Sequence, residues 1–424
     1  MTITEAAANG AAGRGIGDNQ QPKLTYADIL RVGPGTVAGQ YLRTFWHPVL
    51  AGGDIAVGHV KPIRILGEDL TLYRGETGVA HVVAGRCAHR GVMLALGLVQ
   101  GDNIECPYHG WKYDAAGQCI DQPSEPRPFC DRVKIKAYPT QEYLGLVFVY
   151  LGEGEPPPMP RLADYEDDQL YVREIKSDIW PCSYFDLLEN ATDIAHTSHL
   201  HWHFGTQTSP KFEWGEADWG MMGRFERTTK KSEEESIYDR TYFHMPTGAE
   251  FALVQRVGFA GYYTRAWRIP RDDNSAIRFN LVVKPRYEAE ALEAKAKEGK
   301  AGPRALADTQ RAVQSAADVA LGMIAGKEDM RDLKDRSETM NHFYLTNIQD
   351  CAVLASLGPP ETRNFTEQLG GTDVSIALLR RMWLRELQAF SEGRPMKQWR
   401  RPDFLWDDIT ALHRKGAAEH KAAQ

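Results

Sequence analysis

Two short loops, each with one cysteine and one histidine, constrain this chain more than any other feature of its sequence. Cys87-Ala88-His89 is followed, after sixteen intervening residues, by Cys106-Pro107-Tyr108-His109. Each segment can present one thiolate and one imidazole from a tight loop. Two such loops closing on each other form a metal centre with sulfur ligands on one side and nitrogen ligands on the other.

Two kinds of metal centre fit these four ligands. One is a single Zn²⁺ ion in a Cys₂His₂ tetrahedron, and the other is a [2Fe–2S] cluster in which the cysteines hold one iron and the histidines the other. Structural zinc sites usually pair cysteine with cysteine and histidine with histidine, whereas each loop here mixes the two, so the sequence favours iron–sulfur. The remaining alternative is an ordinary pair of turns, and four ligand-type residues at this spacing argue against it.

A second group of histidines lies at 186–205, where four histidines fall within eight residues. At about 100° per residue, Asn190, Asp193 and His196 share one stripe of a helix predicted over 186–199. His201 would lie about 140° away from His196 if that helix continued. A chelating pair therefore requires the helix to end or unwind between the two histidines. A polar helix end with solvated surface imidazoles is the alternative.

The composition is that of a globular chain. Its 424 residues, 42% hydrophobic and 25% charged, allow two or three domains, and no apolar run approaches the roughly 18–20 residues of a membrane span. The 50 basic and 57 acidic side chains give a net charge of −7, which argues against general nucleic-acid binding. Six cysteines are too few for a disulfide scaffold, so we expect a reducing, cytoplasmic location.

Four regions are expected along the chain. Residues 1–23, rich in Ala, Gly, Asn and Gln and without an apolar signal segment, should form a disordered tail. Residues 24–48 should form a helical segment with a Gly-Pro-Gly turn, followed by an all-β module at 49–155. A Pro-rich linker at 152–160 marks the boundary with 156–424.

Within this last region we expect three parts. Alternating runs between 212 and 285 predict an antiparallel sheet, and apolar positions at helical spacing in 373–393 predict a C-terminal helix. The charged segment at 287–335 is expected to be a solvated surface insertion.

The motifs around both histidine groups resemble those of one enzyme family. CAHRG at 87–91 and CPYHGWKYD at 106–114 resemble the Rieske fingerprint, and E-N-x-x-D-x-x-H-x-x-x-x-H at 189–201 resembles the motif of Rieske non-heme iron oxygenases. The resemblance extends from FWHPV at 45–49 to EQLGGTD at 367–373. It points to the oxygenase component (α subunit) on the branch of phthalate and phenoxybenzoate dioxygenases, aryl O-demethylases and anilide N-dealkylases.

This resemblance implies an α+β fold, in which an all-β Rieske [2Fe–2S] domain is inserted into a helix-grip catalytic domain of antiparallel sheet plus helices. Residues 24–48 would pack with the catalytic domain, 49–155 would be the Rieske domain, and 156–424 would carry the mononuclear iron. The implied cluster ligands are Cys87, His89, Cys106 and His109.

The same resemblance implies a mononuclear Fe(II) held by His196 and His201, with a carboxylate from elsewhere completing a 2-His-1-carboxylate facial triad. The I-Q-D segment that ends in Asp350 resembles the one that supplies this carboxylate, although a simple N-cap of the following helix is the alternative for this residue. Competing ligands by residue type are His199, His203, Asp332 and Asp335.

Asp193 is not expected to bind metal. The resemblance implies that its carboxylate bridges His109 of a neighbouring subunit and an iron-ligating histidine within an α₃ homotrimer. Electrons would come from NAD(P)H through a separate reductase, with or without a ferredoxin, and the substrates would be O₂ and a small aromatic molecule.

For the reaction we expect monooxygenation with oxidative O- or N-dealkylation of a substituted aromatic compound. The alternative is cis-dihydroxylation of a phthalate-like aromatic carboxylate, for which Arg240 or Arg265 could bind the carboxylate unless both point to solvent. Two readings from other classes are a Rieske electron-transfer protein without an active mononuclear iron and a zinc-binding regulatory protein. No membrane and no nucleic-acid partner is expected.

Overall fold

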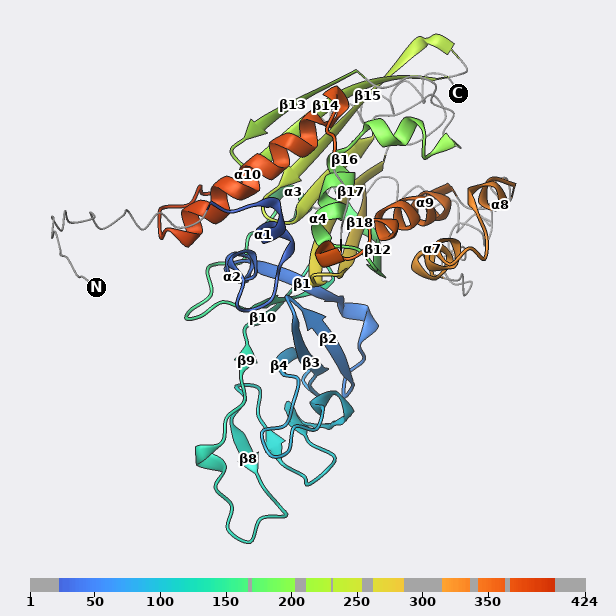
Figure 1. Ribbon diagram of the computed structural model, residues 1–424. Coiled ribbons are helices and arrows are strands. Elements are labelled where there is room, and N and C mark those ends of the chain that lie inside the picture. Colours follow the sequence, from blue (N-terminus) through green and yellow to red (C-terminus); the bar gives the residue numbers. More distant parts are fainter. Residues whose placement is uncertain are drawn as a thin grey trace, which may run out of the picture.

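The computed structural model describes residues 23–166, 170–202, 211–229, 232–253, 262–285, 315–335, 342–362 and 367–400. Two lobes follow one another along the chain, with a narrow lobe drawn blue to teal in Figure 1 below a larger sheet-and-helix lobe. The predicted tail and residues 286–314 lie outside the described residues.

Two short helices open the described chain, as the sequence predicts. They are α1 (Tyr26–Leu30) and α2 (Val37–Arg43), and the side chain of Thr36 caps α2 by accepting a hydrogen bond from the backbone of Gly39. Tyr41 on α2 packs edge-on against Trp383, 5.7 Å between ring centroids, in the C-terminal part of the chain. This contact ties the N-terminal segment to the larger lobe.

Three small antiparallel sheets make up the narrow lobe. Their orders are β1-β11-β10, β2-β3-β4-β9 and β5-β6-β7-β8. The strands are β1 (Trp46–Ala51), β2 (Val60–Ile65), β3 (Glu68–Arg74), β4 (Ala80–Ala84), β5 (Leu98–Gln100), β6 (Asn103–Glu105), β7 (Lys112–Tyr113), β8 (Cys119–Asp121), β9 (Ala137–Tyr138), β10 (Thr140–Tyr143) and β11 (Leu146–Tyr150). Short strands and frequent glycine turns match the all-β prediction for this part of the chain.

A seven-stranded antiparallel sheet forms the body of the larger lobe, in the order β12-β18-β17-β16-β15-β14-β13. Its strands are β12 (Leu170–Trp180), β13 (Lys211–Ala217), β14 (Gly220–Thr229), β15 (Ser232–His244), β16 (Gly248–Leu253), β17 (Tyr262–Asp272) and β18 (Ser275–Pro285). The strand β12, the first of this sheet in sequence, pairs with β18, the last, so segments distant in sequence are brought together.

Among the described residues, the helices of this lobe are α3 (Ala163–Glu166), α4 (Tyr184–Thr192), α7 (Ala316–Ile324), α8 (Met330–Asp335), α9 (His342–Ser356) and α10 (Val374–Ser391). The α10 helix confirms the predicted C-terminal helix. Its fully buried Trp383 contacts the rings of Tyr184 and Phe185 on α4 at 5.8 and 5.7 Å. Aromatic burial therefore holds α4 in place just before the histidine-rich segment.

The insertion predicted at 287–335 is only partly a solvated surface segment. Val319 on α7 and Leu333 on α8 are buried in one apolar cluster with Leu345 and Ile348 on α9. The prediction was wrong for these two helices, because the charged composition of the segment conceals one apolar face on each helix. They support α9, which Figure 1 shows beside them.

The fold confirms the predicted class, a module of small antiparallel sheets joined to a larger sheet-and-helix lobe. The lobes meet where the β17–β18 hairpin reaches the narrow lobe, with Arg64 Nε 2.9 Å from an Asp272 oxygen and the Phe148 and Trp267 rings 5.8 Å apart.

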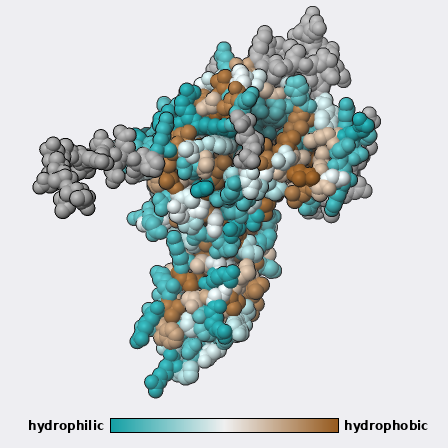
Figure 2. All heavy atoms as spheres, in the orientation of Figure 1, coloured by the Kyte–Doolittle hydropathy of each residue, from teal (hydrophilic) through white to brown (hydrophobic). Residues whose placement is uncertain are grey.

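On the face drawn in Figure 2, polar side chains interrupt the apolar ones over both lobes. Among the described residues, no helix is both long and apolar enough to cross a membrane.

Candidate metal centres

The two predicted ligand loops, between β4 and β5 and between β6 and β7, lie close together and have matching backbone hydrogen bonds. In each, the carbonyl of the cysteine accepts a hydrogen bond from a glycine four residues on, Cys87 from Gly91 and Cys106 from Gly110, both at 3.0 Å. The cysteine N–H groups donate to the carbonyl five residues on, at 2.9 and 2.8 Å. Both glycines have positive φ, +73° and +74°, which side chains rarely adopt. The glycines of the CAHRG and CPYHG motifs thus close the loops.

The imidazoles of the two loops face each other. His89 and His109 lie 4.5 Å apart between ring centroids, and His89 stacks on Trp111 at 4.5 Å with an interplanar angle of 6°. Nδ1 of His89 is buried and has no hydrogen-bond partner among the described residues. A buried ring nitrogen without a partner is costly unless it binds a ligand, so His89 fits a metal bound through this atom.

The two thiols are buried, each 3% exposed. Cys87 Sγ lies 3.1 Å from the hydroxyl of Tyr113, which also accepts a hydrogen bond from the backbone of Ala88. Burial, together with the neighbouring thiol of Cys87, raises the pKa of Cys106. A metal reverses this preference, because a coordinating thiol is deprotonated.

These four ligands fit a cluster better than a single ion. Tetrahedral Zn²⁺ requires ligand atoms about 3.3–3.8 Å apart. Within the described part of the chain, only one set of three or more Cys, His, Asp or Glu residues has all its ligand atoms within 4.8 Å of one another, and it is not this one. No three of the four ligand atoms of these loops therefore lie within 4.8 Å of one another, which is too wide for one ion and favours the [2Fe–2S] alternative.

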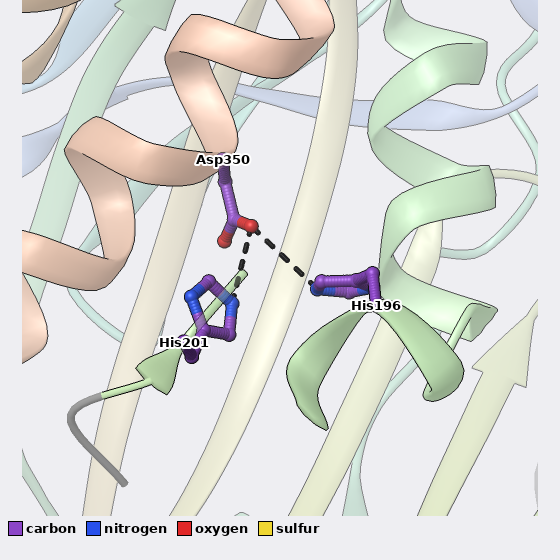
Figure 3. A group of neighbouring side chains, drawn as sticks. All are labelled: His196, His201 and Asp350. Atoms are coloured by element: carbon purple, nitrogen blue, oxygen red, sulfur yellow. Dashed lines mark ion pairs between the residues drawn. The ribbon is translucent and has the colours of Figure 1, made fainter. Parts of the chain in front are cut away.

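That one set is His196, His201 and Asp350, the triad predicted from the sequence. Nε2 of His196 lies 3.6 Å, and Nε2 of His201 3.2 Å, from Asp350 Oδ1 (Figure 3). The side chains come from two segments about 150 residues apart and converge on one point. Two imidazoles and one carboxylate on one side of a site are the ligand set of non-heme Fe(II) enzymes.

The helix before the histidines is shorter than predicted. The α4 helix ends at Thr192, and a separate 3-10 turn covers Ala195–Ser198, whereas the sequence predicted one helix to residue 199. Asp193 ends the helix, and its Oδ1 accepts hydrogen bonds from the backbone of Ala195 at 2.9 Å and His196 at 3.4 Å. Because an Asp side chain competes for backbone N–H groups, the break falls before both histidines rather than between them.

Gln349 is a site residue that sequence reasoning did not identify. Its side chain is buried, and its Oε1 lies 2.9 Å from Nδ1 of His201. An amide oxygen only accepts, so Nδ1 of His201 carries the proton and Nε2 keeps its lone pair for a metal. The only sequence signal was its position next to Asp350.

The amide of Asn190, on the last turn of α4, occupies the space between the ligands. Its Nδ2 lies 3.4 Å from both His196 Nε2 and Asp350 Oδ1. The sequence placed Asn190 on the stripe of Asp193 and His196 but gave it no role.

Carboxylates govern the electrostatics of the triad. Burial lowers the pKa of His196, but the carboxylates of Asp193 and Asp350 outweigh this and raise it above its usual value. Burial raises the pKa of Asp350, but the hydrogen bond and charge of His201 and the charge of His196 outweigh burial and lower it. The carboxylates therefore favour positive charge on the histidines, and the histidines favour negative charge on Asp350. A divalent cation bound between them can supply that positive charge in place of protons.

Three of the four competing ligands are described, and none of them belongs to this group. His199 is exposed, and Asp332 and Asp335 lie on α8; His203 lies outside the described residues. Asp350 is the ninth residue of α9, so the N-cap alternative for it is wrong. The interior of a helix fixes this carboxylate more rigidly than a helix end would.

Asp193 lies beside the triad without being part of it. Its Oδ2 is 3.4 Å from Nδ1 of His196, a long contact whose geometry falls short of a full hydrogen bond, and its side chain is 23% exposed. Asp193 therefore touches one ligand through its outer nitrogen and keeps part of its carboxylate at the surface.

A family model and curated relatives agree with this geometry. Residues 45–139 match the model of the Rieske [2Fe-2S] domain. The chain is 29% identical to the 5,5'-dehydrodivanillate O-demethylase oxygenase subunit of Sphingobium sp. over 87% of this chain and 81% of the relative. It is also 29% identical to the 3-chlorobenzoate-3,4-dioxygenase oxygenase subunit of Comamonas testosteroni, over 85% and 88%.

Solved structures share the fold. An oxygenase in an oxygenase–ferredoxin complex of carbazole 1,9a-dioxygenase superposes with a TM-score of 0.55, at 20% identity, over 84% of this chain and 94% of that one. At this identity the likeness concerns the fold alone, and it extends over both lobes.

Proposed function

This chain is a Rieske non-heme iron oxygenase subunit, homologous over most of its length to oxygenase subunits that act on aromatic compounds. We propose that it is a terminal oxygenase that removes an alkyl group from a substituted aromatic compound by monooxygenation. The presence of the twin cysteine–histidine loops and the 2-His-1-carboxylate triad in one chain carries this proposal. O-demethylation is supported by the O-demethylase subunit to which the chain aligns over 87% of its length.

In this proposal the residues divide into an electron-accepting group and an oxygen-activating group. The cluster is held by Cys87, His89, Cys106 and His109, and the Fe(II) by His196, His201 and Asp350. When bound at these residues, the cluster would supply single electrons and the iron would supply O₂ activation. We propose the corresponding domain limits, 49–155 for the Rieske domain and 156–424 for the catalytic domain, with 24–48 attached to the latter.

The protein's own groups prepare both centres. The Tyr113 hydroxyl lies 3.1 Å from Cys87 Sγ, and with the cluster bound it would donate to the ligand thiolate and stabilise its negative charge. Gln349 keeps the proton of His201 on Nδ1, and Asp193 contacts Nδ1 of His196, so that Nε2 of each ring faces the same point. Asn190 then offers an amide N–H next to that point, 3.4 Å from His196 Nε2 and from Asp350 Oδ1.

Asp193 is proposed as the link between the two centres. Its contact with His196 Nδ1 supports one half of the bridge, and its partly exposed carboxylate is available to His109 of a neighbouring subunit. This proposal requires an α₃ homotrimer, in which electrons cross a subunit interface. The electron donor is a separate reductase fed by NAD(P)H, with or without a ferredoxin, and the six free thiols suit a reducing, cytoplasmic compartment.

Metal analysis and isotope labelling test the function. We expect roughly three irons and two acid-labile sulfides per chain, and loss of about one iron with retention of the cluster spectrum in Asp350→Ala. With a surrogate reductase and ¹⁸O₂, dealkylation places one labelled atom in the products and releases formaldehyde from a methyl ether or N-methyl substrate. Two irons without a third in the wild type would instead identify an electron carrier, and zinc without colour a zinc protein.

Cis-dihydroxylation of an aromatic carboxylate is the second candidate, favoured by the 3-chlorobenzoate dioxygenase subunit among the relatives. The same labelling experiment separates it, since both labelled atoms then appear in one ring-hydroxylated product. No formaldehyde is released in that case.

A further inference from the structure

Two cysteines that the metal centres do not use lie side by side in the narrow lobe. Cys119 begins β8, and Cys130 begins a 3-10 turn at Cys130–Arg132. The backbone N–H of Cys119 donates to the carbonyl of Val133 at 3.0 Å, and the N–H of Val133 donates to the carbonyl of Cys130, also at 3.0 Å. Both cysteines lie outside the ligand loops at 87–91 and 106–110, so the pair is available for chemistry of its own.

The side chain of Gln118 holds the strand and the turn together. Its Nε2 donates to the backbone carbonyls of Cys130 at 2.7 Å and Val133 at 3.0 Å. Gln118 and Lys134 also form an isolated antiparallel bridge. These contacts fix the turn against β8. Two cysteines can form a disulfide only when their backbones are held close together, and this arrangement meets that condition.

The two thiols contact each other. Cys119 is 2% exposed and belongs to the apolar cluster of this lobe, and the partly exposed Cys130 packs against the same cluster. The side chain of Cys119 hydrogen-bonds to that of Cys130, and burial, followed by the charge of Cys130, raises the pKa of Cys119 to about 12. Cys119 therefore stays protonated beside Cys130, and Cys130 is the thiol that a reagent in solution reaches first.

Cys119 also lies next to the proposed cluster. In the strand register it is paired with Tyr113 on β7, and the hydroxyl of Tyr113 lies 3.1 Å from Cys87 Sγ. One side chain, that of Tyr113, thus separates the free thiol pair from a cysteine ligand. A change at Cys119 can reach the cluster through this contact.

The turn that carries Cys130 has a second route to the cluster. Phe129, the residue before Cys130, packs edge-on against Trp111 with 5.5 Å between ring centroids, and Trp111 stacks on His89. A movement of the turn is therefore passed to a histidine ligand as well.

We propose that Cys119 and Cys130 are a redox-active thiol pair, which a low-molecular-weight disulfide oxidises to an intramolecular disulfide, and that this closure lowers the reduction potential of the neighbouring cluster. The Cys130 thiolate attacks the small disulfide, which forms a mixed disulfide and releases one small thiol. The sulfur of Cys119 then loses its proton and displaces the second small thiol. One S–S bond forms and one breaks, two electrons pass to the oxidant, and both protons end on the released thiols.

The expected direction of the cluster response follows from the position of Cys119. An S–S bond of about 2.05 Å is much shorter than the contact between two thiols, so closure draws Cys119 Sγ towards the turn and away from Tyr113. The Tyr113 hydroxyl is then held less firmly against Cys87 Sγ. A weaker hydrogen bond to a ligand sulfur stabilises the reduced cluster less and lowers its potential. This second half of the inference rests on the proposed cluster, whereas the thiol chemistry does not.

Thiol counting on the holoprotein tests the pair. The protein is equilibrated anaerobically with glutathione buffers of increasing oxidised fraction and quenched with N-ethylmaleimide in denaturant. Both cysteines lie in the tryptic peptide 113–132, because trypsin does not cleave between Arg127 and Pro128. In oxidising buffers this peptide should lose both maleimide groups together and become lighter by two hydrogen atoms. Dithiothreitol should restore both groups.

Three variants check the order of the steps. Cys119→Ser should stop at the mixed disulfide and carry one glutathione on Cys130, whereas Cys130→Ser should keep Cys119 reactive to maleimide in every buffer. Cys182→Ser removes a buried thiol of the larger lobe and should behave as the wild type. If one of the first two variants fails to fold, the other and the wild type still decide.

Potentiometric titration followed by electron paramagnetic resonance compares the cluster in the dithiol and disulfide forms. Closure should make reduction of the cluster about tenfold less favourable, which corresponds to about 59 mV for one electron. Tyr113→Phe should still form the disulfide but lose most of this shift. Cys130→Ser should have the same potential in reducing and oxidising buffers.

A wild-type peptide that keeps both maleimide groups in fully oxidised glutathione would overturn the thiol pair. A disulfide that forms without changing the cluster potential would overturn the coupling to the cluster. Iron and sulfide analysis of the same samples separates these outcomes from the proposed function, since closure in a protein that binds no cluster refutes the enzyme but not the thiol pair.

Discussion

At the residue scale, whether a histidine can bind a metal depends on the hydrogen-bond partner of its other ring nitrogen as well as on its position. His201 has this partner in Gln349, whose oxygen lies 2.9 Å from Nδ1, while the neighbouring His199 is exposed. The contact fixes both the tautomer and the orientation of the ring, and such partners commonly matter by one to two orders of magnitude in metal affinity.

We therefore predict that Gln349→Leu lowers the affinity for the mononuclear iron about 10- to 100-fold and leaves the cluster spectrum unchanged. Competition with an iron chelator measures the affinity, and visible absorption monitors the cluster. His199→Ala is the matched control and should retain wild-type affinity. Unchanged iron affinity in Gln349→Leu would show that packing alone orients His201.

His47 gives the stability a defined pH dependence. The ring is fully buried, with Nε2 2.7 Å from the carbonyl of Leu42, and burial lowers its pKa to about 4. Between about pH 6.5 and 4, the unfolded chain binds a proton at this position that the folded chain does not, so stability falls as the pH decreases. Above about pH 6.5, His47 no longer changes the stability with pH, because its ring is neutral in both the folded and the unfolded chain.

The corresponding prediction compares His47→Gln with the wild type between pH 7.5 and 4.5. The wild type should lose about 2–3 kcal/mol of unfolding free energy relative to the variant over this range. Urea denaturation at several pH values measures the difference. The exposed His59, replaced by Gln, should leave the pH dependence as in the wild type, and a constant difference between His47→Gln and wild type would contradict the assignment.

At the element scale, α10 acts as the clamp that holds α1, α2 and α4 on the larger lobe. Trp383 is fully buried against rings from α2 and α4, and Arg380 on the same helix binds the Glu189 carboxylate of α4 at 2.6 and 3.1 Å. Because α4 leads directly into the histidine segment, the packing of α10 also sets the position of His196.

Trp383→Ala should destabilise the protein by about 3–5 kcal/mol, the usual cost of removing a large aromatic side chain from a core. Chemical denaturation monitored by circular dichroism measures this loss. Arg381→Ala, an exposed position two residues earlier on the helix, should change stability by less than about 0.5 kcal/mol. A loss below about 1 kcal/mol in Trp383→Ala would mean that α10 is not a clamp.

At the scale of the whole molecule, the two centres belong to different lobes of one chain. The twin loops lie between strands of the narrow lobe, whereas the triad is formed by residues of α9 and of the segment after α4 in the larger lobe (Figure 3). Electron transfer between them through a neighbouring subunit follows from the proposal that Asp193 bridges two chains.

Asp193→Asn should therefore keep the fold, both metal centres and the trimer, but lose turnover by about 10- to 100-fold or more, since the amide cannot replace the charge of the carboxylate. Circular dichroism, iron analysis, analytical ultracentrifugation and product formation measure the fold, the metal content, the trimer and the turnover, in that order. Near-normal turnover at normal metal content would refute the bridge, and a fully active monomer would remove the need for a trimer.

The sequence by itself determined the chemistry and the class of fold. Cys87, His89, Cys106 and His109 stand at fixed short spacings, and a loop closed by glycine at positive φ is a local property, so the motif letters carry it. The antiparallel sheet and the C-terminal helix also follow from local periodicity. The predicted C-terminal end of α4 was wrong because the Asp193 side chain ends the helix earlier. The predicted surface character of α7 and α8 was wrong because each helix buries one apolar face.

Only the tertiary structure decided which distant groups meet. The convergence of Asp350 with His196 and His201 and the partner of His201 in Gln349 depend on how α9 lies across the sheet. No local pattern encodes these contacts, because residues about 150 positions apart approach each other only when the apolar faces of separate elements are buried together. The sequence therefore predicts which residues are ligands, and the tertiary packing determines which residues contact them.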